Sequence, residues 1–113
     1  FSPDAHERRP ELMEWFRGLY ASGAESTPRE AVLRLIDANL GHDTLDRLHL
    51  IHAPTLVVAG EQDMTFMPRY PRAVAELVPG ARLELLTGEG SSHLLHLERR
   101  DEFLGIALDF LIA

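Results

Sequence analysis

The sequence predicts an α/β fold organised around two parallel strands. Residues 55–59 form a continuous apolar, partly β-branched run, which is typical of a strand covered on both faces. A second apolar run occupies residues 83–86. The spacing of apolar residues predicts one helix at 71–78 and another from about residue 99 to the end of the sequence. The order strand, helix, strand, helix predicts parallel pairing with a right-handed crossover.

The residues before the strands predict helices only. Apolar side chains recur at helical spacing along one stripe of residues 10–20. The tetrapeptide Thr-Pro-Arg-Glu at 27–30 has the pattern of a capping box with proline at the first helical position, and Gly41 is expected to end the helix that it opens. Asp43 is then expected to cap a short helix through about residue 48.

The composition changes near Asp43 from all-helical to strand-bearing, which divides the chain into a cap-like helical segment, 1–43, and an α/β segment, 44–113. An isolated pair of strands is marginally stable in water, and a parallel sheet needs cover on both faces. The run at 55–59 is also too apolar for an edge strand. We therefore expect the chain to be incomplete as a single domain, with its sheet completed by a missing N-terminal half or by a second copy.

Charge and composition argue against several classes of protein. The 113 residues carry a formal net charge of −7 at pH 7, whereas nucleic acids and anionic membrane surfaces are bound by basic faces. There is no cysteine, so disulfides and thiolate metal sites are excluded. No apolar run approaches the roughly 20 residues of a membrane span, and the first ten residues are charged rather than apolar. We expect a cytoplasmic protein with neither a membrane nor a nucleic-acid partner.

Two residues that can carry chemistry follow the carboxyl ends of the predicted strands. Asp63 lies on the loop after the first strand, and His93 lies on a Gly- and Ser-rich loop after the second. An imidazole can take a proton from a nucleophile and return it to a leaving group, and a carboxylate can hold the other ring nitrogen. The sequence therefore predicts a catalytic acid–histidine pair. Plain structural roles, a turn residue for Asp63 and loop packing for His93, are the alternative.

Two stretches resemble a known family. LxxIxAPTLVVAGEQD at 48–63 resembles the region around the last-but-one core strand of α/β-hydrolase-fold enzymes, and PGARL at 79–83 with HLLHLE at 93–98 resembles the final strand and histidine loop. The resemblance implies the C-terminal portion of that fold, preceded by the end of its cap. In this family the nucleophile comes first along the chain, then the acid, then the histidine. The resemblance therefore implies Asp63 as the acid and His93 as the general base.

The sequence departs from the family pattern at two places. Ser91 and Ser92 stand between the Gly-x-Gly and His93, where the family usually has none, and no Gly-x-Ser-x-Gly occurs anywhere. The resemblance implies that the whole enzyme hydrolyses a small ester, lactone or related bond without a cofactor. The nucleophile, Ser or Asp, is left open. With none visible here, we predict that this chain alone is inactive.

Apolar residues near Asp63 are the candidates for substrate contact. Met64, Phe66 and Met67 follow it at the carboxyl end of the sheet, where open α/β folds bind ligands. Trp15 is a further candidate from the cap, although an aromatic stripe at helical spacing also fits simple core packing. These residues predict an apolar substrate, and the resemblance implies that it is a small, ester-like molecule.

Three alternatives compete with this interpretation. His93, His96 and Glu98 offer three possible metal ligands, but their spacing on a loop fixes no geometry, and we predict no metal. A truncated, non-catalytic module could pair its strand edge with another chain or swap domains. A small response-regulator-like domain, with Asp63 accepting a phosphoryl group, lacks the preceding strands and an acidic cluster for magnesium.

Overall fold

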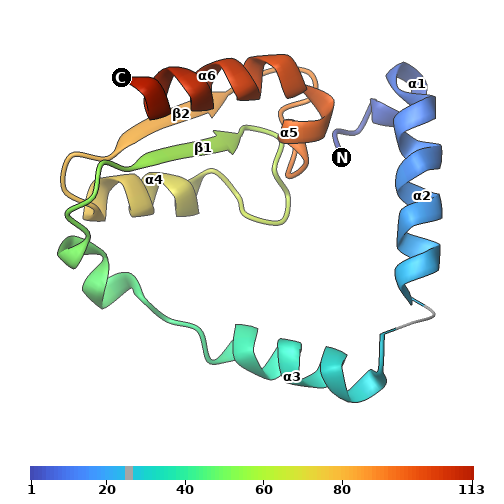
Figure 1. Ribbon diagram of the computed structural model, residues 1–113, viewed down its shortest axis with the longest axis horizontal. Coiled ribbons are helices and arrows are strands. Elements are labelled where there is room, and N and C mark those ends of the chain that lie inside the picture. The colour runs from blue at the N-terminus through green and yellow to red at the C-terminus, as the bar shows by residue number, and fades with distance from the viewer. Residues whose placement is uncertain (25–26) are drawn as a thin grey trace.

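The computed structural model describes residues 1–24 and 27–113 (Figure 1). Helices precede the sheet, and each strand is followed by a helix. The elements in chain order are α1 (Ala5–Arg8), α2 (Pro10–Ala24), α3 (Arg29–Leu40), the 3-10 helix η1 (Leu45–Leu50), β1 (Leu56–Gly60), α4 (Arg69–Leu77), β2 (Arg82–Leu86), α5 (Leu95–Glu98) and α6 (Arg100–Ile112).

The two strands pair in parallel, as the sequence predicts. Leu56 is opposite Arg82 at one end of the ladder and Gly60 is opposite Leu86 at the other. Helix α4 makes the crossover on one face of the sheet, and α6 lies on the other face (Figure 1). Both strands therefore end at the same edge of the sheet, where the loops after β1 and β2 begin.

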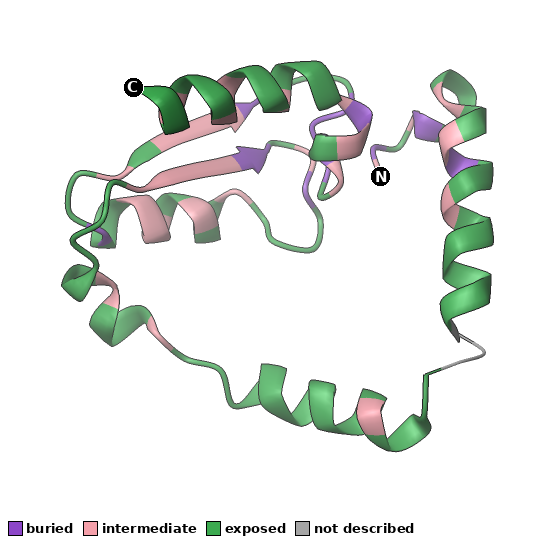
Figure 2. Cartoon of the chain, in the orientation of Figure 1, coloured by how far each residue is buried: buried purple, intermediate pink, exposed green. Residues whose placement is uncertain are grey.

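Within the two strands, burial is greatest at this edge. Ala59 and Gly60 of β1, Leu86 of β2 and Leu95 are buried, whereas the first three residues of β1 are only half-buried (Figure 2). The full cover expected for residues 55–59 is thus not supplied by the described part of this chain. Large apolar side chains are exposed on the two long helices before the sheet: Trp15, Leu19, Tyr20, Val32, Leu33, Leu35, Ile36 and Leu40.

The predicted capping box at 27–30 is wrong. Pro28 occupies the N-cap position of α3, with φ −60° and ψ 139°. The hydroxyl of Thr27 instead donates to the carbonyl oxygen of Gly23 at 2.9 Å, so it is used at the end of α2. Gly41 ends α3 as expected.

Several boundaries shift from the sequence prediction. Asp43 does stabilise the short helix that follows, because its Oδ1 atom accepts a hydrogen bond from the Leu45 amide at 3.2 Å. Thr44 is the N-cap, however, and the helix is of 3-10 type. Helix α5, directly after the histidine loop, was not predicted. Within the described residues, no helix has both the length and the apolar character needed to cross a membrane.

Candidate active site

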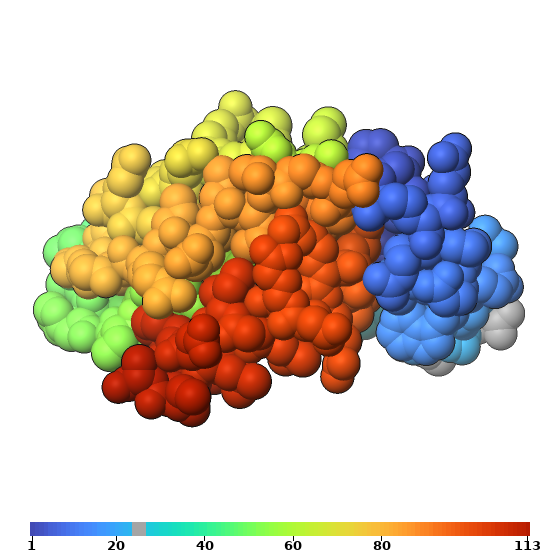
Figure 3. Space-filling model, turned by 90° about the horizontal axis from the view of Figure 1, so that it is seen from above, coloured from blue at the N-terminus to red at the C-terminus, as the bar shows by residue number. Residues whose placement is uncertain are grey.

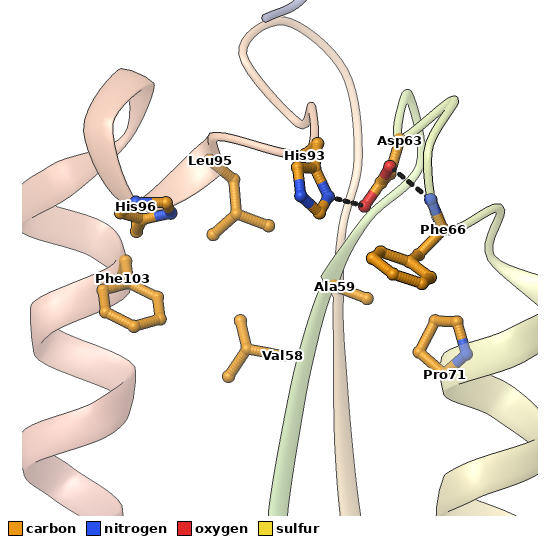
Figure 4. Close-up of a pocket in the computed structure, with 9 residues that line it drawn as sticks. All are labelled: Val58, Ala59, Asp63, Phe66, Pro71, His93, Leu95, His96 and Phe103. Carbon is orange, nitrogen blue, oxygen red and sulfur yellow. Dashed lines mark hydrogen bonds and ion pairs between the residues drawn. The ribbon is translucent and has the colours of Figure 1, made fainter. Parts of the chain in front are cut away.

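Asp63 and His93 are in contact (Figure 4). The Nδ1 atom of His93 lies 3.0 Å from Oδ2 of Asp63. The second carboxylate oxygen, Oδ1, accepts hydrogen bonds from the backbone amides of Thr65 and Phe66, each at 2.8 Å. The carboxylate is thus held by its own loop on one side and presents its other oxygen to the imidazole.

Backbone hydrogen bonds join the two loops that carry this pair. The acid loop, residues 61–68, connects β1 to α4, and the histidine loop, residues 87–94, connects β2 to α5. The amide of Glu61 donates to the carbonyl oxygen of Leu86, and the amide of Gln62 donates to that of Ser91, each at 2.8 Å. Gly60 makes this approach possible, since a Cβ atom there would lie 2.1 Å from the Ser91 carbonyl oxygen. The absence of a side chain at Gly60 therefore brings the acid loop against the histidine loop.

Two glycines allow the histidine loop to turn, and two serines of the loop are buried. Gly88 and Gly90 have φ angles of 74° and 72°, a region that favours glycine. Ser91 and Ser92 are fully buried, and Ser91 donates its hydroxyl to the Gly88 carbonyl oxygen at 2.6 Å. The two serines that depart from the family pattern are thus packed inside the loop, and His93 still reaches Asp63.

The surroundings of Asp63 favour its ionised form, a carboxylate beside the His93 imidazole. Burial raises the pKa of Asp63, but hydrogen bonds from the Phe66 amide, His93 and the Thr65 amide outweigh it and hold this pKa below its ordinary value. Asp63 is 8% exposed, whereas the His93 side chain is 43% exposed. Among the described residues, His93 makes its hydrogen bond through Nδ1, which leaves Nε2 available to another group.

A pocket of about 250 Å³ opens beside the pair. Its lining is mostly apolar and comes from β1, both loops, α4, α5 and α6 (Figure 4). The ring of Phe66 contacts that of His93 at a tilt of 40°, with 5.4 Å between the centroids. The lining residues are Val58, Ala59, Asp63, Phe66, Pro71, His93, Leu95, His96 and Phe103.

The structure brings together only some of the predicted substrate contacts. Phe66 lines the pocket, whereas Met64, Met67 and Trp15 are exposed and do not belong to the lining. Their roles remain predictions. Sequence reasoning missed Phe103 as a pocket residue, because its helical spacing had indicated only a core-facing position on the last helix.

The three possible metal ligands have separate partners. His96 packs edge-on against Phe103, with 6.1 Å between the ring centroids. Glu98, expected at the start of the last helix, instead ends α5 and is buried among hydroxyl groups. Within residues 1–24 and 27–113, no three His, Asp or Glu side chains converge as a metal site.

The chain is similar in sequence and in structure to several known enzymes. A proline iminopeptidase of Lacticaseibacillus rhamnosus (strain Lc 705) is 37% identical over 71 residues, 63% of this chain and 23% of that protein. The enol-lactonase from Burkholderia xenovorans LB400 matches the whole chain at 28% identity, with a TM-score of 0.86 over 41% of its own length. Est816, an N-acyl homoserine lactone degrading enzyme, matches 96% of the chain at 29% identity, with a TM-score of 0.75 over 42% of its length. No protein-family model matches the sequence.

These similar proteins are α/β-hydrolase enzymes. The chain has the fold of the C-terminal portion of that superfamily, comprising two parallel strands with flanking helices, which confirms the predicted fold class. It spans 23% of the iminopeptidase and 41% of the enol-lactonase. The division of the chain at residue 43 remains a prediction.

Proposed function

We propose that this chain supplies the acid and the general base of a catalytic triad in an enzyme that hydrolyses a small ester, lactone or related bond. The observation that carries the proposal is the 3.0 Å contact between Asp63 and His93, with Nε2 of the imidazole left open. The activities named for the similar enol-lactonase and for Est816, a lactone-degrading enzyme, support the reaction class. The nucleophile comes from outside these 113 residues.

Each side chain has a defined role in this mechanism. With a serine nucleophile, the Nε2 atom of His93 takes the hydroxyl proton as the oxygen attacks the carbonyl carbon, and returns the proton to the leaving oxygen. With either nucleophile, Nε2 then takes a proton from the water that hydrolyses the covalent intermediate. Asp63 accepts the hydrogen bond from Nδ1–H, which fixes the tautomer and stabilises the imidazolium. The apolar walls at Phe66, Leu95 and Phe103 favour a small apolar acyl group.

The free edge of β1 is where the rest of the enzyme would join. The described sheet has the order β1-β2, so one edge of β1 has no paired strand. A second apolar hollow, of about 400 Å³, shares Val58 and Phe103 with the pocket and continues along β1 and α6. A strand from an N-terminal half, or from a second copy, would pair with this edge and fill the hollow.

Reconstitution tests the proposal. Nitrophenyl esters of short acids are incubated with this chain alone, with an N-terminal half that carries a nucleophile elbow, and with the two combined. We expect turnover only in the combination, and none when the chain carries His93→Ala. Equal turnover with the His93→Ala chain would contradict the proposal, because the imidazole would then not be the base.

A non-catalytic interaction module is the second candidate. The free edge of β1 and the apolar side chains exposed on α2 and α3 favour it, since both features can pair with another chain. In this case the reconstituted mixture would assemble without hydrolysing any ester. A cytoplasmic location and the absence of membrane and nucleic-acid partners are retained as predictions.

A further inference from the structure

A buried carboxylate that the proposed mechanism does not use lies next to the histidine loop. Glu98, the last residue of α5, is 8% exposed. Its Oε1 atom accepts hydrogen bonds from the Ser2 amide at 2.8 Å and from the Ser92 hydroxyl at 2.5 Å. Its Oε2 atom accepts the hydroxyl of Ser2. Ser2, Ser92 and Glu98 are called the Glu98 cluster below.

The ionised form of Glu98 is the one that these contacts stabilise. Burial raises its pKa, but the hydrogen bonds from the hydroxyls of Ser2 and Ser92 and from the Ser2 amide outweigh burial, so the pKa lies below its ordinary value. All three donors belong to other parts of the chain. A buried carboxylate with three donors is a strong local constraint on the segments that supply them.

One of these segments holds His93 directly. Ser92 precedes His93, and its hydroxyl oxygen accepts the Leu94 amide at 3.0 Å while its hydroxyl hydrogen is donated to Glu98. The carbonyl oxygen of Ser92 accepts the Leu95 amide at 3.1 Å. The backbone on both sides of His93 is therefore fixed through Ser92, and the position of the Ser92 side chain is set by Glu98.

The other segment joins the N-terminal helices to the same loop. Ser2 is 3% exposed, and Figure 3 shows the N-terminal residues packed against the segment that contains the histidine loop. Arg9, between α1 and α2, donates from Nη1 to the carbonyl oxygen of Glu98 at 3.2 Å. Arg8 pairs with Glu89 of the loop at 3.1 Å. Glu98 is thus the point at which residues 96 positions apart meet.

We propose that Glu98 is a positioning residue for His93, acting through Ser92 and itself held by the amide and hydroxyl of Ser2. The inference rests on the proposed function only for its effect on catalysis. The structural part stands by itself: the Glu98 cluster sets where the imidazole lies relative to Asp63. Removing the Glu98 carboxylate frees the Ser92 hydroxyl and leaves the Ser2 amide and hydroxyl without their acceptor.

The direct test observes the His93 ring in the chain labelled with ¹⁵N at histidine. We expect a low-field proton signal from Nδ1–H, because this proton is donated to the buried carboxylate of Asp63. Glu98→Ala should broaden or shift this signal. Glu98→Gln keeps an acceptor oxygen and nearly the same shape, so this variant should show an Nδ1–H signal close to that of the wild type. Glu76→Ala, which removes an exposed carboxylate on α4, should leave the signal unchanged.

The outcomes separate positioning from general stability. The amide signals of β1 and β2 report whether each variant is folded. A folded Glu98→Ala chain with an unchanged Nδ1–H signal would overturn the inference. If Glu98→Ala does not fold, Ser92→Ala decides, because it deletes a single hydroxyl beside His93. We expect Ser92→Ala to move the signal more than Ser2→Ala, and an unmoved signal would again overturn the inference.

Activity gives a second readout in the reconstituted enzyme. A small misplacement of a reacting group can cost about 100-fold in rate, so Glu98→Ala should lower kcat by roughly 10- to 100-fold with KM changed less than about twofold. An unchanged kcat together with a moved Nδ1–H signal would refute the catalytic part alone. If no variant, including the wild type, is active while the signal moves, the proposed function fails and the positioning role stands.

Discussion

Gly60, the last residue of β1, lies against the backbone of Ser91 in the histidine loop. A Cβ atom at Gly60 would come within 2.1 Å of the Ser91 carbonyl oxygen and 2.5 Å of its carbonyl carbon. The same carbonyl oxygen accepts the Gln62 amide from the acid loop. The two loops are therefore packed backbone to backbone, and the meeting of Asp63 with His93 depends on that contact.

Gly60→Ala should separate the loops. The new methyl group meets backbone rather than a flexible side chain, so we expect a loss of about 1–3 kcal/mol in the free energy of unfolding. Urea denaturation measures this change. Gly105→Ala in α6 is the control, because a Cβ atom at this position meets nothing within 4 Å. This substitution should stabilise the helix by up to about 1 kcal/mol, since alanine has the higher helix propensity. Equal stability of the two variants would show that the loops can separate without cost.

Asp63→Asn should lower turnover of the reconstituted enzyme by about four orders of magnitude. The amide can donate to Nδ1 and so favours the wrong tautomer, which leaves Nε2 protonated and unable to act as a base. The measurement is kcat on a nitrophenyl ester. Asp109→Asn, an exposed change on α6, should leave kcat unaltered. Near-normal turnover of Asp63→Asn would remove this carboxylate from the mechanism.

Stability should fall in acid because the two buried carboxyl groups, Asp63 and Glu98, have lowered pKa values in the folded chain. The ordinary values are 3.8 for Asp63 and 4.5 for Glu98. Below these values the unfolded chain binds more protons than the folded chain, so stability is present above them and is lost as the pH falls through the lowered values. Urea midpoints measured from about pH 6 to about pH 3 should therefore decrease. The double variant Asp63→Asn, Glu98→Gln should show a flatter profile.

If the urea midpoint of the double variant falls with pH as steeply as that of the wild type, Asp63 and Glu98 are not the source of the acid sensitivity. The loss would then come from groups elsewhere in the chain. Asp109→Asn is the matched control and should reproduce the wild-type slope.

The chain alone should self-associate. Its β1 edge has no partner strand among the described residues, and Leu111, which lines the adjoining apolar hollow, is 75% exposed. Light scattering after size exclusion, at several protein concentrations, should give a mass that rises with concentration. Leu111→Lys should reduce this association by placing a charge in the hollow. A folded monomer at every concentration would contradict the expectation that another chain completes the sheet.

The meeting of Asp63 with His93 could be predicted because it depends on local rules. Two apolar runs separated by a helix predict parallel strands, and parallel strands end at one edge of the sheet. The role of Glu98 could not be predicted in this way, since its partner Ser2 lies 96 residues away and no periodicity relates them. The capping box failed for a different reason: the Thr27 hydroxyl makes another local hydrogen bond, to the carbonyl oxygen of Gly23 four residues earlier, instead of capping α3.

A double-mutant cycle on residues 63 and 93 tests the central claim most directly. The kcat/KM of the reconstituted enzyme is measured for Asp63→Asn, His93→Ala and the double variant. If Asp63 acts only through the imidazole, the double variant should be no slower than His93→Ala alone. Losses that simply multiply would contradict the account, because the carboxylate and the histidine would then act independently.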